Sequence, residues 1–366
     1  MSRVTFRTAR YARAWIVGPT NFAEEELRLD RGGTTIPATL VRPLQTSERL
    51  PAWVVLHGIT RQGRAHEQLA RFTRAIISTG AVAIVPEVPE WREMALAPHL
   101  VVPTLKAAIA GLRSSEWARE APVGVIGFSF SAPHVIAATA HPDLREDIAG
   151  SVAFGGYCDL ARTIRFLMTG MHEWKGRHHH LIPDAYGRWI VAANYMTAVP
   201  EYEDATDVAD ALRTLARHAG DVSIPALDPR LDPRKAELRA SVAEERRPLF
   251  DLFAPVSARL PDAERGPEAA EALAAAAHKV DAESEPARAL AAVERPVHVL
   301  HGRRDHLIPF SEGLRLQEAL PAGTWSRATI TRLFGHSKQD SFPSLLRALK
   351  ELPMFFGALR GLLQLV

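Results

Sequence analysis

Two kinds of segment alternate along most of this chain: short apolar runs typical of buried strands, and longer runs with the spacing of amphipathic helices. The strand-like runs lie at residues 25–30, 34–43, 51–58, 81–88, 123–129, 148–156, 295–302 and 325–335. Helix-like runs lie between them at residues 67–80, 100–112, 131–140 and 312–320. This alternation favours an α/β fold, in which a mainly parallel central sheet is flanked by helices on both faces. The first two runs are separated by a turn at Gly32 and Gly33, so we expect them to pair as a hairpin.

The alternation is interrupted once, between about residue 160 and residue 294. This segment has helical spacing, proline breaks and alanine-rich runs but no clear strand-like run, so we expect a helical insertion that lies over the sheet. A single hydrophobic core stops growing near ~250–300 residues, so 366 residues suit one core that carries an insertion. We therefore expect residues 1–159 and 295–366 to form the core, the second part with C-terminal helices, and residues 160–294 to form the insertion.

Ser129 occupies the turn between the strand-like run that ends at Phe128 and the helix-like run that begins at Ser131. The segment from Gly127 to Ser131 matches the pattern G-x-S-x-G except at its last position. Small residues are needed in this pattern because the serine backbone is strained and the helix packs close to the strand. We interpret Ser129 as a nucleophile exposed above the edge of the sheet, with Ser131 small enough to stand in place of the final glycine.

The segment "VVLHG" ends the third strand-like run and leaves Gly58 and Ile59 in the loop that follows. The backbone N–H of Ile59 and the backbone N–H of Phe130, the residue after the nucleophile, are expected to form an oxyanion hole. The side chain at position 59 matters little for this purpose, because the donor is the backbone.

A serine hydroxyl needs a base to remove its proton as it attacks, and the base needs a carboxylate to orient it. Asp305 follows the strand-like run 295–302, and His336 follows the last run, 325–335. Ser129, Asp305 and His336 therefore occur in the order nucleophile, acid, histidine, each after a strand. We interpret these three residues as a catalytic triad.

Taken together, "LHG", "GFSFS", "GRRDHLIP" and "GHS" resemble the motifs of the α/β-hydrolase superfamily, over roughly residues 25–160 and 290–350. The resemblance implies that Ser129 attacks an acyl carbonyl, His336 shuttles the proton and Asp305 holds the histidine tautomer. It also implies that the insertion, which falls between the sixth and seventh expected strands, is a cap or lid. Ser131 departs from the superfamily pattern.

We expect a serine hydrolase that cleaves carboxylic esters through an acyl-enzyme intermediate, without a metal or another cofactor. Ester cleavage is favoured over amide cleavage because an alkoxide leaves more readily than an amine. Two other interpretations stay open. An acyltransferase would use the same triad with an acceptor other than water, and a non-catalytic ligand-binding protein could keep this fold.

Several residues have a competing structural interpretation. Asp159 is a rival for the acid, but an aspartate at this place suits the N-cap of the helix that follows. Cys158 is expected to be a buried small residue rather than a nucleophile. Three adjacent histidines, His178, His179 and His180, are expected in a solvent-exposed loop, since neighbouring histidines do not converge easily on one metal ion.

The remaining candidates are assigned to structure or left open. His57 is expected to stabilise the oxyanion loop, and His134, His301 and His306 are expected to be structural or to lie at the rim of the site. Arg61 is expected at the surface, with contact to an anionic substrate as the alternative. Aromatic and sulfur side chains early in the insertion could line an acyl pocket or form a core of the insertion itself: Trp174, Tyr186, Trp189, Tyr195 and Met196.

Composition narrows the range of partners. A net charge of +2 provides no strong field for nucleic acid, so the expected partner is a small-molecule ester substrate. A single cysteine is compatible with a reducing compartment, and the N-terminus lacks the apolar core of a signal peptide, so we expect a cytoplasmic protein. The C-terminal stripe from Leu345 to Leu363 predicts an amphipathic helix that Pro353 breaks or kinks, and no run is apolar enough to span a membrane. The oligomeric state is not predicted.

Overall fold

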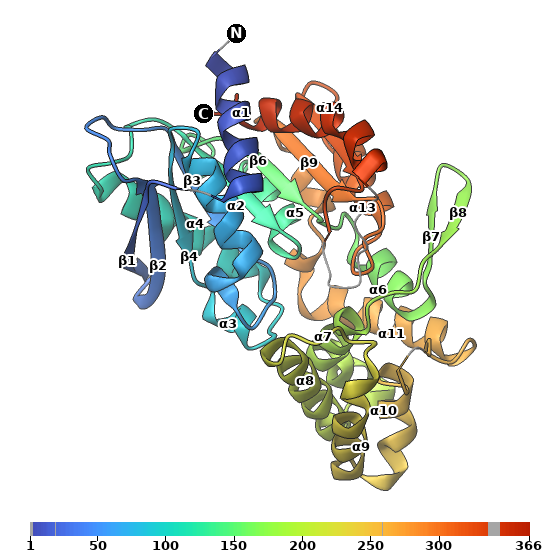
Figure 1. Cartoon of the computed structure of the whole chain (residues 1–366). Coiled ribbons are helices and arrows are strands. Elements are labelled where there is room, and N and C mark those ends of the chain that lie inside the picture. Colours follow the sequence, from blue (N-terminus) through green and yellow to red (C-terminus); the bar gives the residue numbers. More distant parts are fainter. Residues whose placement is uncertain (1–2, 19, 258, 336–344) are drawn as a thin grey trace.

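A mainly parallel sheet of eight strands forms the centre of the structure (Figure 1). The computed structural model describes residues 3–18, 20–257, 259–335 and 345–366. In sequence order the strands are β1 (Phe22–Arg31), β2 (Thr34–Pro43), β3 (Ala52–Leu56), β4 (Val82–Pro86), β5 (Val123–Phe128), β6 (Ile148–Phe154), β9 (Val297–Gly302) and β10 (Ser326–Thr331). Their spatial order is β1-β2-β4-β3-β5-β6-β9-β10. β2 is antiparallel to β1 and β4, and the other neighbours are parallel. The expected α/β fold and the N-terminal hairpin are confirmed.

Helices cover both faces of this sheet, because alternate residues of its buried strands point to opposite sides. In β3, Trp53 and Val55 belong to one hydrophobic cluster, and Val54 and Leu56 belong to another. The first cluster includes residues of α1 (Arg3–Val17), α2 (Glu67–Ile77) and α14 (Leu345–Leu362). The opposite face is covered by α4 (Val101–Ser114), α5 (Ser131–Ala138) and α13 (Phe310–Glu318).

The two terminal helices lie together on the first face, and both differ from expectation (Figure 1). The N-terminal segment was not predicted to be helical, yet α1 packs Tyr11 against Phe72 of α2. Arg7 of α1 donates hydrogen bonds to the backbone oxygens of Leu363 and Val366, at 2.8 and 3.1 Å. These bonds join α1 to the residues that follow α14.

α14 continues as one helix through Pro353, so a break at this residue, one of the two expected effects beside a kink, is wrong. Proline removes one backbone donor from a helix, but the neighbouring turns of α14 pack Ala358, Leu359 and Leu362 into the hydrophobic core. Tertiary packing therefore outweighs the local penalty. Among the described helices, none combines the length and the apolar character needed to cross a membrane.

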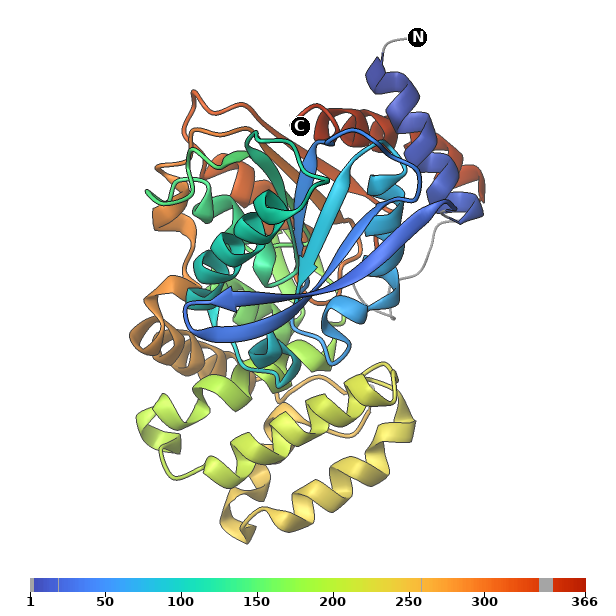
Figure 2. The same cartoon turned by 90° about the vertical axis from the view of Figure 1, so that its left-hand side faces the viewer.

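Residues 160–294 follow β6 and precede β9, and most of them are helical. The helices of this segment are α6 (Leu160–Thr169), α7 (Ala185–Tyr195), α8 (Thr206–Asp221), α9 (Asp232–Ser241), α10 (Arg247–Phe253), α11 (Arg265–Val280) and α12 (Ala287–Leu290). The helices from α7 to α10 lie beyond one end of the central sheet in both views (Figures 1 and 2), and the short α12 packs against α5.

The same segment contains a hairpin that the sequence did not predict, formed by β7 (Met171–Trp174) and β8 (Arg177–His180). Lys175 and Gly176 make its two-residue turn with positive φ angles of 50° and 76°. Two positive φ angles in a two-residue loop match the twist of a tight hairpin. The three adjacent histidines therefore lie on strand β8, and their expected place in a loop is wrong.

Candidate active site

Ser129 lies in the sharp turn between β5 and α5, with a backbone φ of 57°. Its backbone N–H donates to the carbonyl of Phe154 on β6 at 2.7 Å, and its carbonyl accepts from the N–H of Ala132 at 3.0 Å. A left-handed conformation at a non-glycine residue costs about 1–3 kcal/mol and persists only where the surroundings impose it. This turn holds Ser129, which is half-buried, at the carboxyl edge of the parallel strands.

The residues beside Ser129 are small because α5 begins very close to β5. A Cβ at Gly127 would lie 2.8 Å from the carbonyl oxygen of Ser131 and 2.9 Å from the Cα of Ala132. Ser131, the departure from the sequence pattern, is fully buried, and its Oγ accepts from the N–H of Phe128 at 2.9 Å. The same hydroxyl lies 3.2 Å from the carbonyl oxygen of Leu56 on β3 and can donate to it. Serine at this position therefore joins the turn to the ends of two strands.

The loop after β3 approaches Ser129 closely. A Cβ at Gly58 would lie 2.8 Å from the Cβ of Ser129 and 3.4 Å from its Oγ, so only glycine fits here. Ile59 follows in the same loop, and Phe130 follows Ser129 on the opposite side of this contact. Within the part of the chain that the structure describes, the backbone N–H groups of Ile59 and Phe130 donate no hydrogen bond. The two segments that meet at Ser129 thus each carry a backbone donor with no acceptor among the described residues.

Asp305 lies in the loop after β9 and is 1% exposed. Its Oδ1 accepts from the backbone N–H groups of Leu307 and Ile308, each at 2.9 Å, and its Oδ2 lies 3.2 Å from Nε2 of His301. These bonds fix the direction of the carboxylate. Because β5, β6 and β9 are parallel neighbours, the loops of Ser129 and Asp305 share the carboxyl edge of the sheet.

His336, the predicted base, lies outside the described residues. The structure therefore brings Ser129 together with Phe130 and with the loop of Ile59, and it places Asp305 on the same edge of the sheet. Among the described contacts, none joins Asp305 directly to Ser129. A triad needs no such contact, since the histidine lies between the acid and the nucleophile.

The competing acid, Asp159, caps a helix. Its carboxylate accepts from the N–H of Arg162 at 2.8 Å at the start of α6, as expected for an N-cap, and it pairs with the Arg162 guanidinium at 2.9 Å. Cys158 beside it is 4% exposed, and burial raises the pKa of its thiol to about 12. A thiol with this pKa is protonated at neutral pH and is a poor nucleophile.

Most other histidines have structural partners. His134 is buried on α5 with its Nε2 3.0 Å from the hydroxyl of Tyr157, and burial lowers the pKa of His134 to about 3. The ring of His301 lies 2.9 Å from the carbonyl oxygen of Ile308, and that of His306 lies 2.6 Å from the carbonyl oxygen of Ile182. Within the described ranges, no group of three or more His, Cys, Asp or Glu side chains is placed to hold a metal ion.

Helices of the 160–294 segment contact the loops at the carboxyl edge of the sheet. At the start of α7, the N–H of Asp184 donates to the carbonyl of His306, the residue after Asp305, at 2.7 Å. The side chain of Asn194, at the other end of α7, accepts from the N–H of Leu96 at 3.0 Å and donates to the carbonyl of Met94 at 2.8 Å. α7 therefore spans the distance between the loop after β9 and the loop after β4.

Arg61 joins a third loop, the one after β3, to α8. Its guanidinium pairs with Asp221 at 2.8 Å and with Glu93 at 2.6 Å. These two carboxylates raise the pKa of Arg61, chiefly through the hydrogen bond to Asp221. Arg61 is thus engaged in a contact between the core and the 160–294 segment rather than isolated at the surface.

The aromatic side chains of the segment divide into two groups. Trp189, Tyr195 and Met196 are buried and belong to a hydrophobic cluster with helices of the same segment, which favours a core role for them. Tyr186 is only partly buried and donates from its hydroxyl to the sulfur of Met94 at 3.1 Å. Trp174 lies on the β7–β8 hairpin, with the Arg315 guanidinium 5.5 Å from its ring centre.

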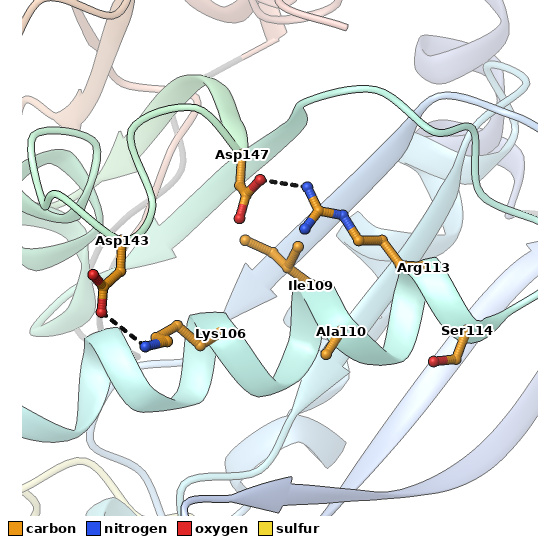
Figure 3. Close-up of a pocket in the computed structure, with 7 residues that line it drawn as sticks. All are labelled: Lys106, Ile109, Ala110, Arg113, Ser114, Asp143 and Asp147. Atoms are coloured by element: carbon orange, nitrogen blue, oxygen red, sulfur yellow. Dashed lines mark hydrogen bonds and ion pairs between the residues drawn. The ribbon is translucent and has the colours of Figure 1, made fainter.

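A surface groove lies between α4 and the turn that precedes β6 (Figure 3). Lys106 pairs with Asp143 at 2.8 Å across it, and Arg113 pairs with Asp147. Asp147 comes directly before β6, so this groove lies at the amino edge of the parallel strands, opposite Ser129. Its charged side chains are paired with one another, and it is separate from the candidate site.

Two buried carboxylates at the carboxyl edge were not singled out in the sequence. Glu87 follows β4 and is 4% exposed, and Glu312 on α13 is fully buried. Glu312 accepts from the backbone N–H groups of Cys158 and Asp159 at 3.1 and 2.9 Å, which ties α13 to the loop after β6. Neither lies in a recognisable motif. For Glu87, the feature of the sequence that could have drawn attention to it is its position as a lone glutamate directly after the fully apolar strand β4.

Comparison with known proteins gives structural likeness only. No protein-family model matches the sequence, and no curated protein matches it. An esterase from Pyrobaculum calidifontis is 14% identical, with 99% of this chain and 93% of that chain covered and a TM-score of 0.50. Est1E from Butyrivibrio proteoclasticus is 10% identical, with 93% and 97% covered and a TM-score of 0.48. An acylaminoacyl peptidase from Pyrococcus horikoshii is 12% identical, with 93% of this chain but 41% of that chain covered and a TM-score of 0.49.

Proposed function

We propose that this chain, which has the α/β-hydrolase fold, is a serine hydrolase that cleaves carboxylic esters through an acyl-enzyme on Ser129. The observation that carries the proposal is the strained turn at Ser129, whose side chain lies against Gly58, the residue before the proposed donor Ile59. Left-handed strain at a single serine between a strand and a helix is a feature of nucleophile turns in this fold.

In the first step, the Oγ of Ser129 attacks the carbonyl carbon of the ester, and its proton passes to His336. The developing negative charge on the carbonyl oxygen is stabilised by the N–H groups of Ile59 and Phe130. The tetrahedral species then expels the alkoxide, which takes the proton from His336, and leaves an acyl group on Ser129. Asp305 orients His336 and stabilises its charged form, a role that suits a buried carboxylate held by two backbone N–H groups.

In the second step, His336 removes a proton from water, and the resulting hydroxide attacks the acyl carbon. Collapse of this second tetrahedral species returns the proton to Ser129 and releases the carboxylic acid. No metal or other cofactor enters this scheme.

We further propose that residues 160–294 act as a cap on a core formed by residues 1–159 and 295–366. The contacts of α7 and α8 with the loops after β3, β4 and β9 support this division, because all three loops lie at the edge that carries Ser129. A cap over this edge would restrict water and select substrates by size.

Covalent labelling tests the proposal directly. The wild-type protein, Ser129→Ala, His336→Ala and the control Ser151→Ala are incubated with a fluorescent fluorophosphonate, and the labelled peptide is mapped. Ser151 is a suitable control because it is a fully buried serine on the neighbouring strand β6. We expect label on Ser129 in the wild type and in Ser151→Ala, and none in Ser129→Ala.

Turnover of nitrophenyl esters of increasing chain length is measured in parallel. Ser129→Ala and His336→Ala should lower kcat by several orders of magnitude while the circular dichroism spectrum is unchanged. Folded wild-type protein that neither takes the label nor hydrolyses any ester of the series would contradict the proposal and favour a ligand-binding role.

A further inference from the structure

Glu87 places a buried carboxylate beside the loop that carries the proposed oxyanion donor Ile59. It follows β4 directly, and its Oε1 lies 3.0 Å from Nε2 of His57. The backbone N–H of Arg64 points to the same oxygen at 3.4 Å. The carboxylate thus contacts both ends of the loop that runs from His57 to Arg64.

The fit around this carboxylate is close. A Cβ at Gly63, whose φ is 52°, would lie 2.0 Å from Oε1 of Glu87. The guanidinium groups of Arg64 and Arg92 lie 3.7 and 3.8 Å from its other oxygen. Burial acts to raise the pKa of Glu87, but the hydrogen bond and charge of His57, together with Arg92, hold that pKa below its ordinary value. Glu87 is therefore an anion at neutral pH.

His57 connects this anion to the backbone of Gly58. Its Nδ1 lies 2.7 Å from the carbonyl oxygen of Gly58, and a carbonyl oxygen can only accept, so Nδ1 carries a proton. At Nε2 two contacts compete, because the nitrogen either donates to Glu87 or accepts from the N–H of Val88 at 3.1 Å. Val88 follows Glu87 directly, so both contacts hold Nε2 at the end of β4 while Nδ1 faces the Gly58 carbonyl.

The bond from His57 to the Gly58 carbonyl has a consequence for Ile59, because the two groups belong to one peptide unit. The Gly58–Ile59 peptide is trans, so its C=O and N–H point in opposite directions. Holding the carbonyl toward His57 directs the N–H of Ile59 away from the imidazole. Rotation of this peptide would replace the donor by a carbonyl oxygen beside Ser129.

We propose that Glu87 is a positioning residue which, through His57, fixes the orientation of the Gly58–Ile59 peptide and so keeps the Ile59 N–H available to the oxyanion. The inference rests on the proposed function, because it needs an oxyanion to form at Ser129. The aromatic packing supports this role. The ring centroid of Trp91 lies 5.4 Å from that of His57 and 5.6 Å from that of Phe130, so Trp91 packs against one residue from each of the two donor segments.

The test compares an ester with the corresponding thionoester in the wild type, Glu87→Gln and His57→Asn. Sulfur accepts hydrogen bonds more weakly than oxygen, so an intact oxyanion hole favours the ester strongly. Deleting one such donor costs about 10²–10³-fold in kcat, and we expect a displaced donor to cost about 10- to 100-fold. The loss should fall on kcat for the ester, with KM little changed and the thionoester much less affected. The ester-to-thionoester ratio of kcat/KM should therefore fall in both variants.

Glu90→Gln is the matched control, because Glu90 lies three residues further on, in α3 (Pro89–Arg92), and accepts from Arg31 at 3.1 Å on a more exposed surface. Glu90→Gln should keep the wild-type kcat for the ester and the wild-type ester-to-thionoester ratio of kcat/KM. The double variant Glu87→Gln/His57→Asn should be no worse than either single variant, since both act on the same peptide. Thermal unfolding and fluorophosphonate labelling of Ser129 are recorded for each protein.

The possible outcomes separate this inference from the proposed function. A wild type that takes no label and hydrolyses no ester would overturn the proposed function and this inference with it. An active wild type, with Glu87→Gln or His57→Asn retaining its kcat and ratio, would overturn only the role of Glu87. A variant that loses ester and thionoester turnover equally would also overturn it, because that pattern indicates a general structural defect. If Glu87→Gln does not fold, the ester-to-thionoester ratio of kcat/KM in His57→Asn decides whether the proposed role is overturned.

Discussion

At the scale of single residues, packing around Ser129 offsets the strain of its backbone. The left-handed backbone costs energy, and three contacts hold it in place: the bond to Phe154, the approach of Gly58 and the hydroxyl of Ser131. The sequence pattern predicted such a turn and allowed serine at position 131. It did not predict how that serine is used, because the acceptor on β3 is brought there only by the sheet.

Asp305 and Asp159 provide a prediction that separates a catalytic carboxylate from a capping one. Asp305→Asn should lower kcat by roughly 10³- to 10⁴-fold, as expected when the carboxylate that orients the base is neutralised. Asp159→Asn should retain most activity and stability, because asparagine caps a helix about as well as aspartate. Both are checked by ester kinetics and thermal unfolding.

The two aspartates control for each other, since each lies in a loop after a neighbouring parallel strand. Loss of activity in Asp159→Asn, with Asp305→Asn unaffected, would show that the acid comes from the loop after β6. Such a result would require a different triad.

At the scale of helices and strands, the expected alternation of segments was enough to predict the eight-stranded sheet. Buried parallel strands are nearly continuous apolar runs, and the helices between them have regular apolar spacing. The failures have distinct physical causes. The β7–β8 turn uses Lys175 where a stronger hairpin signal would have asparagine, and α1 is stabilised by contacts with α2 and α14 that are distant in sequence.

Pro353 provides a prediction for α14. The residue is exposed within a continuous helix, so replacing it by alanine adds a backbone donor without leaving a cavity. Pro353→Ala should raise the free energy of unfolding by about 1–3 kcal/mol, within the ~3 kcal/mol cost of a proline inside a helix. Chemical denaturation checks this. A lower stability would mean that proline restricts the unfolded chain more than it disturbs the helix.

At the scale of the whole molecule, the 160–294 segment meets the rest of the chain through one shared hydrophobic cluster and through polar contacts made by loops. The sequence predicted that this segment is mostly helical, but it did not predict these polar contacts, because each joins residues far apart in the chain. Asn194 of α7 bonds to the loop after β4, and Arg61 and Gln62 of the loop after β3 bond to Asp221 and Ser223 at the end of α8.

The Arg61 contact gives the last prediction. The side chain of Arg61 is 22% exposed and bridges Glu93 and Asp221, so its removal takes away the ion pair of Asp221 at the end of α8 and leaves the pair of Arg217 with Glu93. Partly exposed ion pairs contribute about 0.2–1 kcal/mol each, which is too little to unfold the protein but enough to shift a local opening equilibrium several-fold. Hydrogen exchange of the backbone amides at residues 218–224 should therefore be several-fold faster in Arg61→Ala and Asp221→Asn.

Arg239→Ala is the control for this measurement. Arg239 pairs with Asp251 at 2.7 Å within the 160–294 segment and makes no link to the core among the described ion pairs. Exchange at residues 218–224 should be unchanged in this variant. Equal acceleration in all three variants would mean that the segment responds to any loss of surface charge. Unchanged exchange in Arg61→Ala would mean that the other contacts of α8, such as Arg217 with Glu93 and Gln62 with Ser223, hold its end in place without Arg61.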